Sequence, residues 1–243
     1  MKRVVTGSLR AILSCNFTTL DPAIFRHRFV DVLSDYYLSL SMIPFKKCVM
    51  RWNCVTICIP KLTASCQRGR VVAVKVIRLH MSWVEELLSA DPELRVVQLV
   101  RDPRGILESW RKVSATNMTE MEMRFSADLL CRRMAEDCET RRRLEELFPG
   151  RIVLVRYEDL VTDTYHVLRS IYTELLQLQM PTSVRKELAR QMKADSDDGS
   201  AGTKRKNGKA TAYQWKQEID REYLGYVNNT CRSVISLLNY DKP

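Results

Sequence analysis

The sequence contains no run of 18 or more apolar residues, so it predicts no membrane-spanning helix. Lys2 and Arg3 are not followed by a continuous apolar stretch, which argues against an intact signal peptide at this end. The chain also has no Gly-x-x-x-x-Gly-Lys-Ser/Thr motif, and this disfavours a nucleotide kinase that depends on the lysine of that motif. Histidine is scarce, at three residues, and internal repeats are absent.

Positive charge, by contrast, is in excess. The 243 residues include 39 Lys and Arg against 29 Asp and Glu, which gives a net charge of +10. Such a balance favours anionic partners, whether a nucleotide, an acidic glycan or a nucleic acid. The basic residues are spread along the chain, with local runs at Arg141-Arg142-Arg143 and Lys204-Arg205-Lys206. Because aromatic residues do not interleave with a concentrated basic face, nucleic-acid binding is the least favoured of these alternatives.

Eight cysteines and three Asn-x-Ser/Thr sequons are typical of a protein of the secretory lumen, where disulfides persist. The sequons begin at Asn16, Asn117 and Asn228. Four of the cysteines lie close together in the sequence: Cys48, Cys54, Cys58 and Cys66. This cluster predicts either zinc ligands or disulfides, and disulfides are favoured because no second cysteine or histidine pair completes a zinc site. The sequence leaves their pairing open.

Hydrophobic patterning predicts strands that alternate with helices from residue 71 onward. The predicted strands cover residues 71–79, 95–100 and 152–155, and the predicted helices cover 81–90, the segment from 103, 119–148, 163–178 and 182–193. A polar stretch at 194–210 predicts a mobile loop, helices are expected near 213–221 and 226–238, and an amphipathic helix is expected at 22–40. The alternation indicates an α/β fold with a parallel sheet, and the length indicates one domain over residues 1–243.

The junction after the second of these strands carries the strongest functional signal. The run Val96-Val97-Gln98-Leu99-Val100 predicts a buried strand that ends at Arg101. Asp102 and Pro103 then suit the cap and the first residue of a helix. Such a junction directs an arginine and unpaired helix N–H groups at one point, where a phosphate binds well. Ser109 returns to the helix face that carries Asp102, so its hydroxyl can supply another donor to the same anion.

This junction resembles the 3′-phosphate-binding element of sulfotransferases, in particular the Golgi carbohydrate sulfotransferases that act on galactose, N-acetylgalactosamine or N-acetylglucosamine. Further segments, in the family's order from about Cys66 to Tyr240, resemble its other elements: Val74-Lys75-Val76-Ile77-Arg78-Leu79, Leu130-Cys131-Arg132, Arg156-Tyr157-Glu158-Asp159-Leu160, Trp215, Cys231 and Asn239-Tyr240. The resemblance implies a three-layer sulfotransferase fold, similar to that of P-loop NTPases, around a central parallel sheet. The chain departs from the family's pattern at Cys138 and at Asn239, where leucine and glycine are more usual.

The family's other nucleotide element is an N-terminal strand followed by a Gly/Ser-rich loop that cradles the 5′-phosphosulfate. The opening residues 1–10 do not predict a strand, a small-residue loop and a helix, and Thr6-Gly7-Ser8 is only a faint echo of that loop. We therefore expect a sulfotransferase domain truncated at its N-terminus, without the family's first strand, phosphosulfate loop and membrane anchor.

The resemblance implies transfer of a sulfuryl group from 3′-phosphoadenylyl sulfate to a sugar hydroxyl of a glycan, at the 6-O position of Gal, GalNAc or GlcNAc. It further implies adenosine 3′,5′-bisphosphate as the product, no metal and a location in the Golgi lumen or membrane. The alternative is an inactive relative that binds nucleotide or glycan without catalysis.

Two residues form the predicted 3′-phosphate site, Arg101 and Ser109. Lys75 is the candidate catalytic residue: within an apolar strand it either faces the transferred sulfuryl group or lies near the sheet's edge and reaches solvent. No general base is identified, although His80 follows the strand that carries Lys75.

Two further residues are predicted to contact the nucleotide. Tyr157 either stacks on the adenine or belongs, with the acidic residues that follow it, to helix caps and ion pairs around Arg156. Arg205 lies in a stretch that partly resembles the family's mobile nucleotide-binding loop, and the alternative there is a solvated run of charge.

Overall fold

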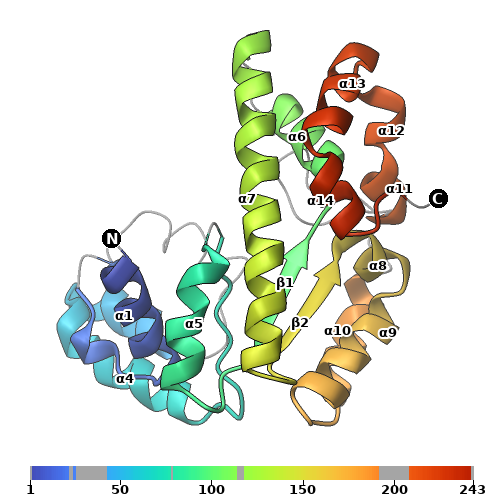
Figure 1. The fold of residues 1–243 in the computed structure, drawn as a ribbon. Coiled ribbons are helices and arrows are strands. Elements are labelled where there is room, and N and C mark those ends of the chain that lie inside the picture. Colours follow the sequence, from blue (N-terminus) through green and yellow to red (C-terminus); the bar gives the residue numbers. More distant parts are fainter. Residues whose placement is uncertain are drawn as a thin grey trace. The chain divides into compact units, whose positions relative to one another are not determined.

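A computed structural model of the chain describes residues 2–21, 24–25, 43–77, 79–113, 118–191 and 208–241. Within it the chain forms two compact units, Met1–Leu79 and His80–Pro243, and each is described by itself (Figure 1). The single domain over residues 1–243 stays a prediction. Most of the predicted helix at 22–40, and residues 194–207 of the predicted loop, lie outside the described residues.

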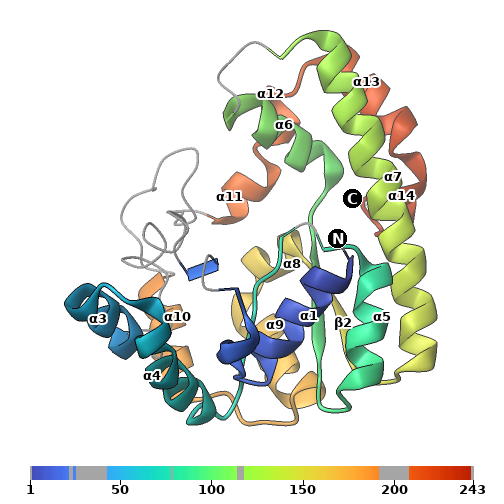
Figure 2. The same ribbon diagram turned by 90° about the vertical axis from the view of Figure 1, so that its left-hand side faces the viewer.

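The first unit is helical and is held by disulfides. Its elements are α1 (Lys2–Leu13), the short 3-10 helix η1 (Phe17–Thr19), α3 (Ile43–Trp52) and α4 (Val55–Gln67) (Figure 2). Disulfides join Cys15 to Cys66 and Cys48 to Cys58. The prediction of disulfides in the cysteine cluster is confirmed, and the zinc alternative is wrong because three of its four thiols are consumed. Thr6-Gly7-Ser8 lies inside α1, in helical backbone.

The predicted strand at 71–79 is wrong for the part that the structure describes. Residues 71–77 adopt neither helix nor strand, and Val71, Val76 and Ile77 are 48%, 40% and 75% exposed. A strand forms only where its backbone N–H and C=O groups pair with a neighbouring strand. No such backbone hydrogen bond is found for residues 71–77 among the described residues. The valine-rich composition therefore signals strand propensity without supplying the partner.

The second unit contains a parallel pair of strands, β1 (Val96–Val100) and β2 (Ile152–Arg156), as the sequence predicts. Val96 pairs with Ile152 at one end and Val100 with Arg156 at the other, so both strands end at the same edge of the sheet. These are the two strands found in the described part of the chain. The fold is thus mixed α/β with a small parallel sheet, and the larger three-layer fold stays a prediction.

Helices surround this sheet largely where the sequence places them. They are α5 (Met81–Ala90), α6 (Pro103–Val113), α7 (Glu120–Leu147), α8 (Tyr157–Thr162), α9 (Thr164–Ser170) and α10 (Thr182–Gln191). Thr119 and Glu122 form a reciprocal capping box that starts α7, the long helix beside the sheet in Figure 1. The predicted helix at 163–178 is confirmed over residues 164–175, where α9 continues directly into a π-helical turn, η4 (Ile171–Leu175), and it ends before residue 178.

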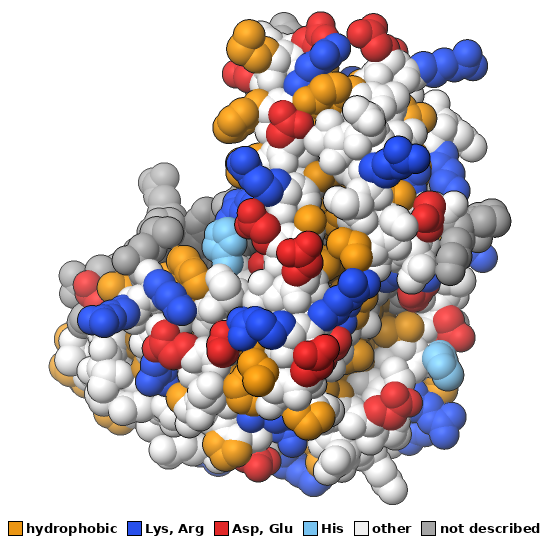
Figure 3. Space-filling model, viewed as in Figure 1, with side chains coloured by type: hydrophobic (Ala, Val, Ile, Leu, Met, Phe, Trp, Pro, Cys, Tyr) orange, Lys and Arg blue, Asp and Glu red, His pale blue; other side chains and the backbone are white. Residues whose placement is uncertain are grey.

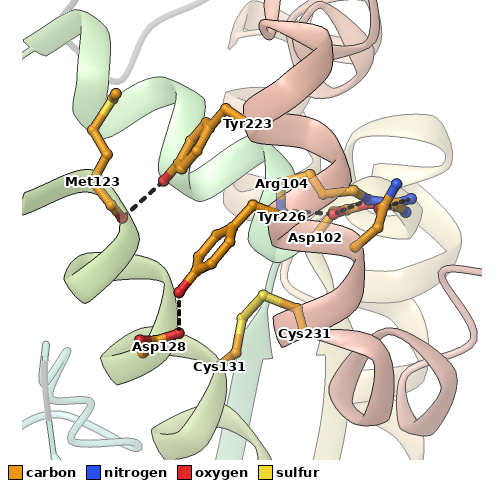
Figure 4. The surroundings of a disulfide bond; sticks show 9 residues. Asp102, Arg104, Met123, Asp128, Cys131, Tyr223, Tyr226 and Cys231 are labelled. Atoms are coloured by element: carbon orange, nitrogen blue, oxygen red, sulfur yellow. Dashed lines mark hydrogen bonds and ion pairs between the residues drawn. A yellow bond between two sulfur atoms is a disulfide. The ribbon is translucent and has the colours of Figure 1, made fainter. Parts of the chain in front are cut away.

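The C-terminal region divides more finely than the sequence predicts, into α11 (Gly208–Tyr213), α12 (Trp215–Glu218), α13 (Arg221–Thr230) and α14 (Arg232–Leu237). The predicted boundary at 226 is wrong because Asp220 caps α13 by accepting the amides of Glu222 and Tyr223. The predicted loop also ends early, since residues 208–210 begin α11. A disulfide between Cys131 and Cys231 pins this region to α7, and two tyrosine hydroxyls bond to α7 beside it (Figure 4).

The core of this second unit is built from α6, α7 and the C-terminal helices. Its buried members include Leu107, Ala127, Trp215, Val227 and Val234. No helix in the described ranges has the length and apolar character to cross a membrane. On the face drawn in Figure 3, basic side chains are interspersed with acidic and apolar ones and do not form one continuous basic surface.

Candidate anion-binding site at the end of the first strand

The strand, the cap and the helix at the junction between β1 and α6 form as the sequence predicts, but the prediction of a buried strand is wrong because Val97 and Leu99 are 44% and 55% exposed. Val100 is buried at the end of β1, and the Asp102 carboxylate caps α6 by accepting the Arg104 amide at 2.9 Å. Pro103 is the first residue of the helix, where its missing N–H costs nothing. One expectation is wrong: the Asp102 and Arg104 amides are not left unpaired, because they bond to Glu158 and Asp102. Anion binding at this junction therefore depends on side chains more than on helix amides.

Arg101 lies where these elements meet and keeps part of its donor capacity unused. Its guanidinium carbon lies 4.9 Å from the centre of the Tyr157 ring at the start of α8, a cation–π contact that orients the side chain. Its Nε is buried and has no hydrogen-bond partner among the described residues. A buried N–H without an acceptor is uncommon in a folded protein and calls for an explanation, such as a ligand.

Two buried acids, Asp102 and Glu158, form hydrogen bonds that stabilise this junction. Glu158 is 4% exposed and accepts both the Asp102 amide, at 3.1 Å, and the Tyr240 hydroxyl, at 2.8 Å. Burial, reinforced by the Glu158 charge, holds the pKa of Tyr240 far above its usual range, so the phenol stays a donor. The sequence gives no sign of this contact because residues 158 and 240 are 82 positions apart.

Arg104 forms an ion pair with Asp102, the other buried acid. Its Nε and a terminal nitrogen donate to the two Asp102 oxygens at 2.9 and 2.7 Å (Figure 4). The same terminal nitrogen also donates to the Tyr240 carbonyl. A bidentate pair of this kind is strong and geometrically fixed. Because Asp102 is paired with Arg104, its charge does not consume the guanidinium of Arg101.

Ser109 is half-buried on α6, and no hydrogen bond or ion pair of its side chain is found in the described part of the chain. It lies one helical turn beyond Gly105, about 6 Å along the axis, on the same side of the helix. The structure thus places Arg101 and Ser109 on one helix–strand unit and leaves a donor of each side chain available.

The other predicted site residues are less closely gathered. Tyr157 contacts Arg101 as described, while Arg156 forms the expected ion pair with Asp159, at 2.7 Å. Lys75 is exposed and lies in backbone that is neither helix nor strand, and its two alternatives stay predictions. Arg205 lies outside the described residues.

His80, the histidine that follows the predicted strand of Lys75, precedes α5 and has its Nε2 2.8 Å from a terminal nitrogen of Arg133. The cysteines, histidines and acids of the described ranges form no group of three or more that could hold a metal ion.

Comparison with known proteins decides the family. The model of the sulfotransferase family matches residues 49–181, more than half of the chain. The chain belongs to the sulfotransferase family. The match spans the β1–α6 junction and both strands, and it confirms the resemblance found in the sequence.

Curated relatives agree with this assignment. The chain is 28% identical to carbohydrate sulfotransferase 1 of Danio rerio over 205 residues, which are 77% of this chain and 48% of the relative. It is 28% identical to carbohydrate sulfotransferase 1 of Homo sapiens, over 72% of this chain and 46% of the relative. For carbohydrate sulfotransferase 3 of Mus musculus the identity is 26%, over 72% and 40%. The chain thus spans about half the length of these relatives or less. No solved structure matches it.

Proposed function

We propose that this sulfotransferase-family chain transfers a sulfuryl group from 3′-phosphoadenylyl sulfate to a hydroxyl of a glycan. The observation that carries the proposal is the buried Arg101 Nε at the end of β1, for which the described residues supply no hydrogen-bond partner. The names of the curated relatives, which are carbohydrate sulfotransferases, support a carbohydrate as the acceptor. By the same likeness we propose the 6-O position of Gal, GalNAc or GlcNAc and a location in the Golgi.

In this proposal Arg101 and Ser109 bind the 3′-phosphate of the nucleotide. A guanidinium and a hydroxyl on a rigid strand–helix unit suit a phosphate, and they distinguish this donor from ATP, which has no phosphate at that position. Tyr157, which already contacts Arg101, would border the nucleotide and leave its ring available to the adenine. Contacts of Arg205 with the nucleotide and of Lys75 with the sulfuryl group stay proposals.

The reaction itself requires few protein groups. The sulfuryl group passes to the sugar oxygen, which loses its proton to a base, and adenosine 3′,5′-bisphosphate leaves. Such a step gains from donors aimed at the leaving phosphate and from a base placed at the attacking hydroxyl. In this proposal the chain contributes the dock that holds the nucleotide at the end of β1.

Binding of adenosine 3′,5′-bisphosphate, measured by calorimetry, tests the proposal. We expect wild-type protein to prefer it to adenosine 5′-monophosphate. Arg101→Ala should weaken the bisphosphate by about 2–5 kcal/mol, roughly 30-fold to several thousand-fold, because a desolvated phosphate loses its charged partner. Arg132→Ala, which removes an exposed arginine of α7, is the matched control and should leave the affinity unchanged.

Each other outcome has a definite meaning. Equal affinity of wild type and Arg101→Ala for the bisphosphate refutes the assignment of the dock. Binding without transfer of sulfate to any Gal, GalNAc or GlcNAc acceptor, followed by mass spectrometry, supports the inactive relative instead. Salt-sensitive binding to DNA or RNA, with no response to the bisphosphate, indicates a nucleic-acid-binding protein.

A further inference from the structure

Trp215 combines two properties that rarely occur together. Its side chain is only 5% exposed and belongs to the core of the second unit. Its Nε1, however, is buried without a hydrogen-bond partner in the described part of the chain. A buried tryptophan usually finds an acceptor for its N–H, because desolvating an unpaired donor costs free energy. An explanation confined to packing leaves this donor unaccounted for.

The nitrogen of this indole lies close to Gly105, as does the Arg101 Nε. A β-carbon placed on Gly105, in the first turn of α6, would lie 3.3 Å from Trp215 Nε1 and 3.3 Å from Arg101 Nε. The two nitrogens that lack partners among the described residues therefore lie beside the same stretch of backbone, at Gly105. The same β-carbon would lie 2.9 Å from Trp215 Cδ1, so only glycine allows this approach.

The orientation of the indole is fixed by contacts that do not use its N–H. The guanidinium carbon of Arg104 lies 4.6 Å from the centre of the Trp215 ring, and Arg104 is itself held by Asp102 and by the Tyr240 carbonyl. The indole is thus pinned in place while its donor stays unused. A group of atoms that can only donate, next to two arginines, selects an anionic acceptor.

We propose that Trp215 is a nucleotide-binding residue whose indole N–H donates to the same 3′-phosphate that Arg101 binds. This inference rests on the proposed function and deepens it: the phosphate is held between β1–α6 and the C-terminal helix α12. Binding of the nucleotide then supplies the acceptor that both buried donors lack.

Trp215→Phe tests the inference, since phenylalanine keeps an aromatic ring and removes the N–H. We expect the affinity for adenosine 3′,5′-bisphosphate to fall by about tenfold or more, as for the loss of a hydrogen bond to a charged group. The affinity for adenosine 5′-monophosphate should stay unchanged. The melting temperature of the free variant should fall, because the smaller ring leaves space in the core, and it is measured beside the affinity to show that the protein remains folded. Trp83→Phe, the same substitution on α5, is the control and should behave as wild type.

A measurement on unaltered protein keeps the test decisive if Trp215→Phe does not fold. With ¹⁵N-labelled tryptophan, the Trp215 indole proton should shift downfield when the bisphosphate is added, and not with the monophosphate. Bisphosphate affinity equal to wild type in Trp215→Phe, or an unmoved indole signal at saturation, overturns the inference. If Arg101→Ala still loses binding, the proposed function stands without it; if wild-type protein binds no bisphosphate, both fall.

Discussion

The two strands of the sheet end side by side, and each end carries an arginine with a different fate. Arg156 is the last residue of β2. In the parallel register it pairs with Val100, the residue that directly precedes Arg101. Its guanidinium donates to both oxygens of Asp159, at 2.7 and 2.8 Å, and to the carbonyls of Leu238 and Asn239. Arg101 has an aromatic neighbour and a buried Nε that finds no acceptor in the described part of the chain. The same side chain is structural at one strand end and available to a ligand at the other.

The difference comes from the C-terminal segment. Residues 238–240 provide the carbonyls for Arg156 and Arg104 and the phenol for Glu158. These contacts pair with Arg156 at the end of β2, with Arg104 and with the buried Glu158, and none of them involves Arg101. Because this segment pairs with Arg104 and Arg156 but not with Arg101, Arg101 is the arginine at this edge that stays available for binding. The predictions below test whether that division holds.

The largest expected effect comes from releasing the C-terminal segment. The double change Cys131→Ser and Cys231→Ser opens a disulfide with a sequence separation of 100. The loop-entropy model then predicts a loss of about 4.7 kcal/mol of stability. Denaturant unfolding should show this loss of stability directly. Opening the disulfide should disturb the end of β2 most, because the carbonyls that Arg156 binds come after Cys231 in the sequence.

The first unit offers a matched comparison. Cys48 and Cys58 have a separation of only 10, so replacing both with serine should cost about 2.7 kcal/mol in the same model. Equal losses for the two pairs would show that loop length does not govern them. A Cys131/Cys231 variant as stable as wild type would show that packing alone holds the C-terminal helices on α7.

Much of this edge could be read from the sequence, and the part that could not is long-range. Strand, cap and helix at Val100–Pro103 are local signals, and all three form as predicted. The different roles of Arg101 and Arg156 cannot be predicted from local sequence, because both arginines follow apolar runs. Only the fold shows that Arg156 binds the carbonyl of Asn239. The segment around Lys75 shows a strand prediction that fails. Its valine-rich pattern predicts a strand, but the described residues supply no neighbouring strand to pair with it.

An effect of intermediate size on stability is expected for Tyr240, whose hydroxyl donates to Glu158. Tyr240→Phe removes one of the two donors to the buried Glu158 carboxylate, and should cost about 1.5–3 kcal/mol at neutral pH. The native pKa of Tyr240 is raised by burial and by Glu158, so its contribution is complete below the ordinary value near 10. Above that pH only the unfolded chain ionises, and wild-type protein should lose about 1.4 kcal/mol per pH unit from this residue.

Unfolding measured between pH 9 and pH 12 should therefore show a shallower decline in Tyr240→Phe than in wild type. Tyr223, whose pKa is raised to about 12 by burial, contributes a similar decline to both proteins. Tyr213→Phe, at an exposed position of α11, is the control and should keep the wild-type slope. Parallel curves for Tyr240→Phe and wild type would contradict a buried, un-ionised Tyr240.

The smallest effect on stability, and the most direct test of the division between the two arginines, comes from Arg156→Ala. It removes a partly exposed ion pair and two bonds to carbonyls at 3.2 and 3.3 Å, so we expect a loss of about 1–2 kcal/mol. Because Arg156 is consumed within the protein, its removal should change bisphosphate affinity less than threefold wherever the variant is folded. Arg101→Ala should show the mirror image, with near wild-type stability and lost binding. If Arg156→Ala abolishes binding while remaining folded, the two strand ends share the ligand, and the available Nε of Arg101 is not what distinguishes them.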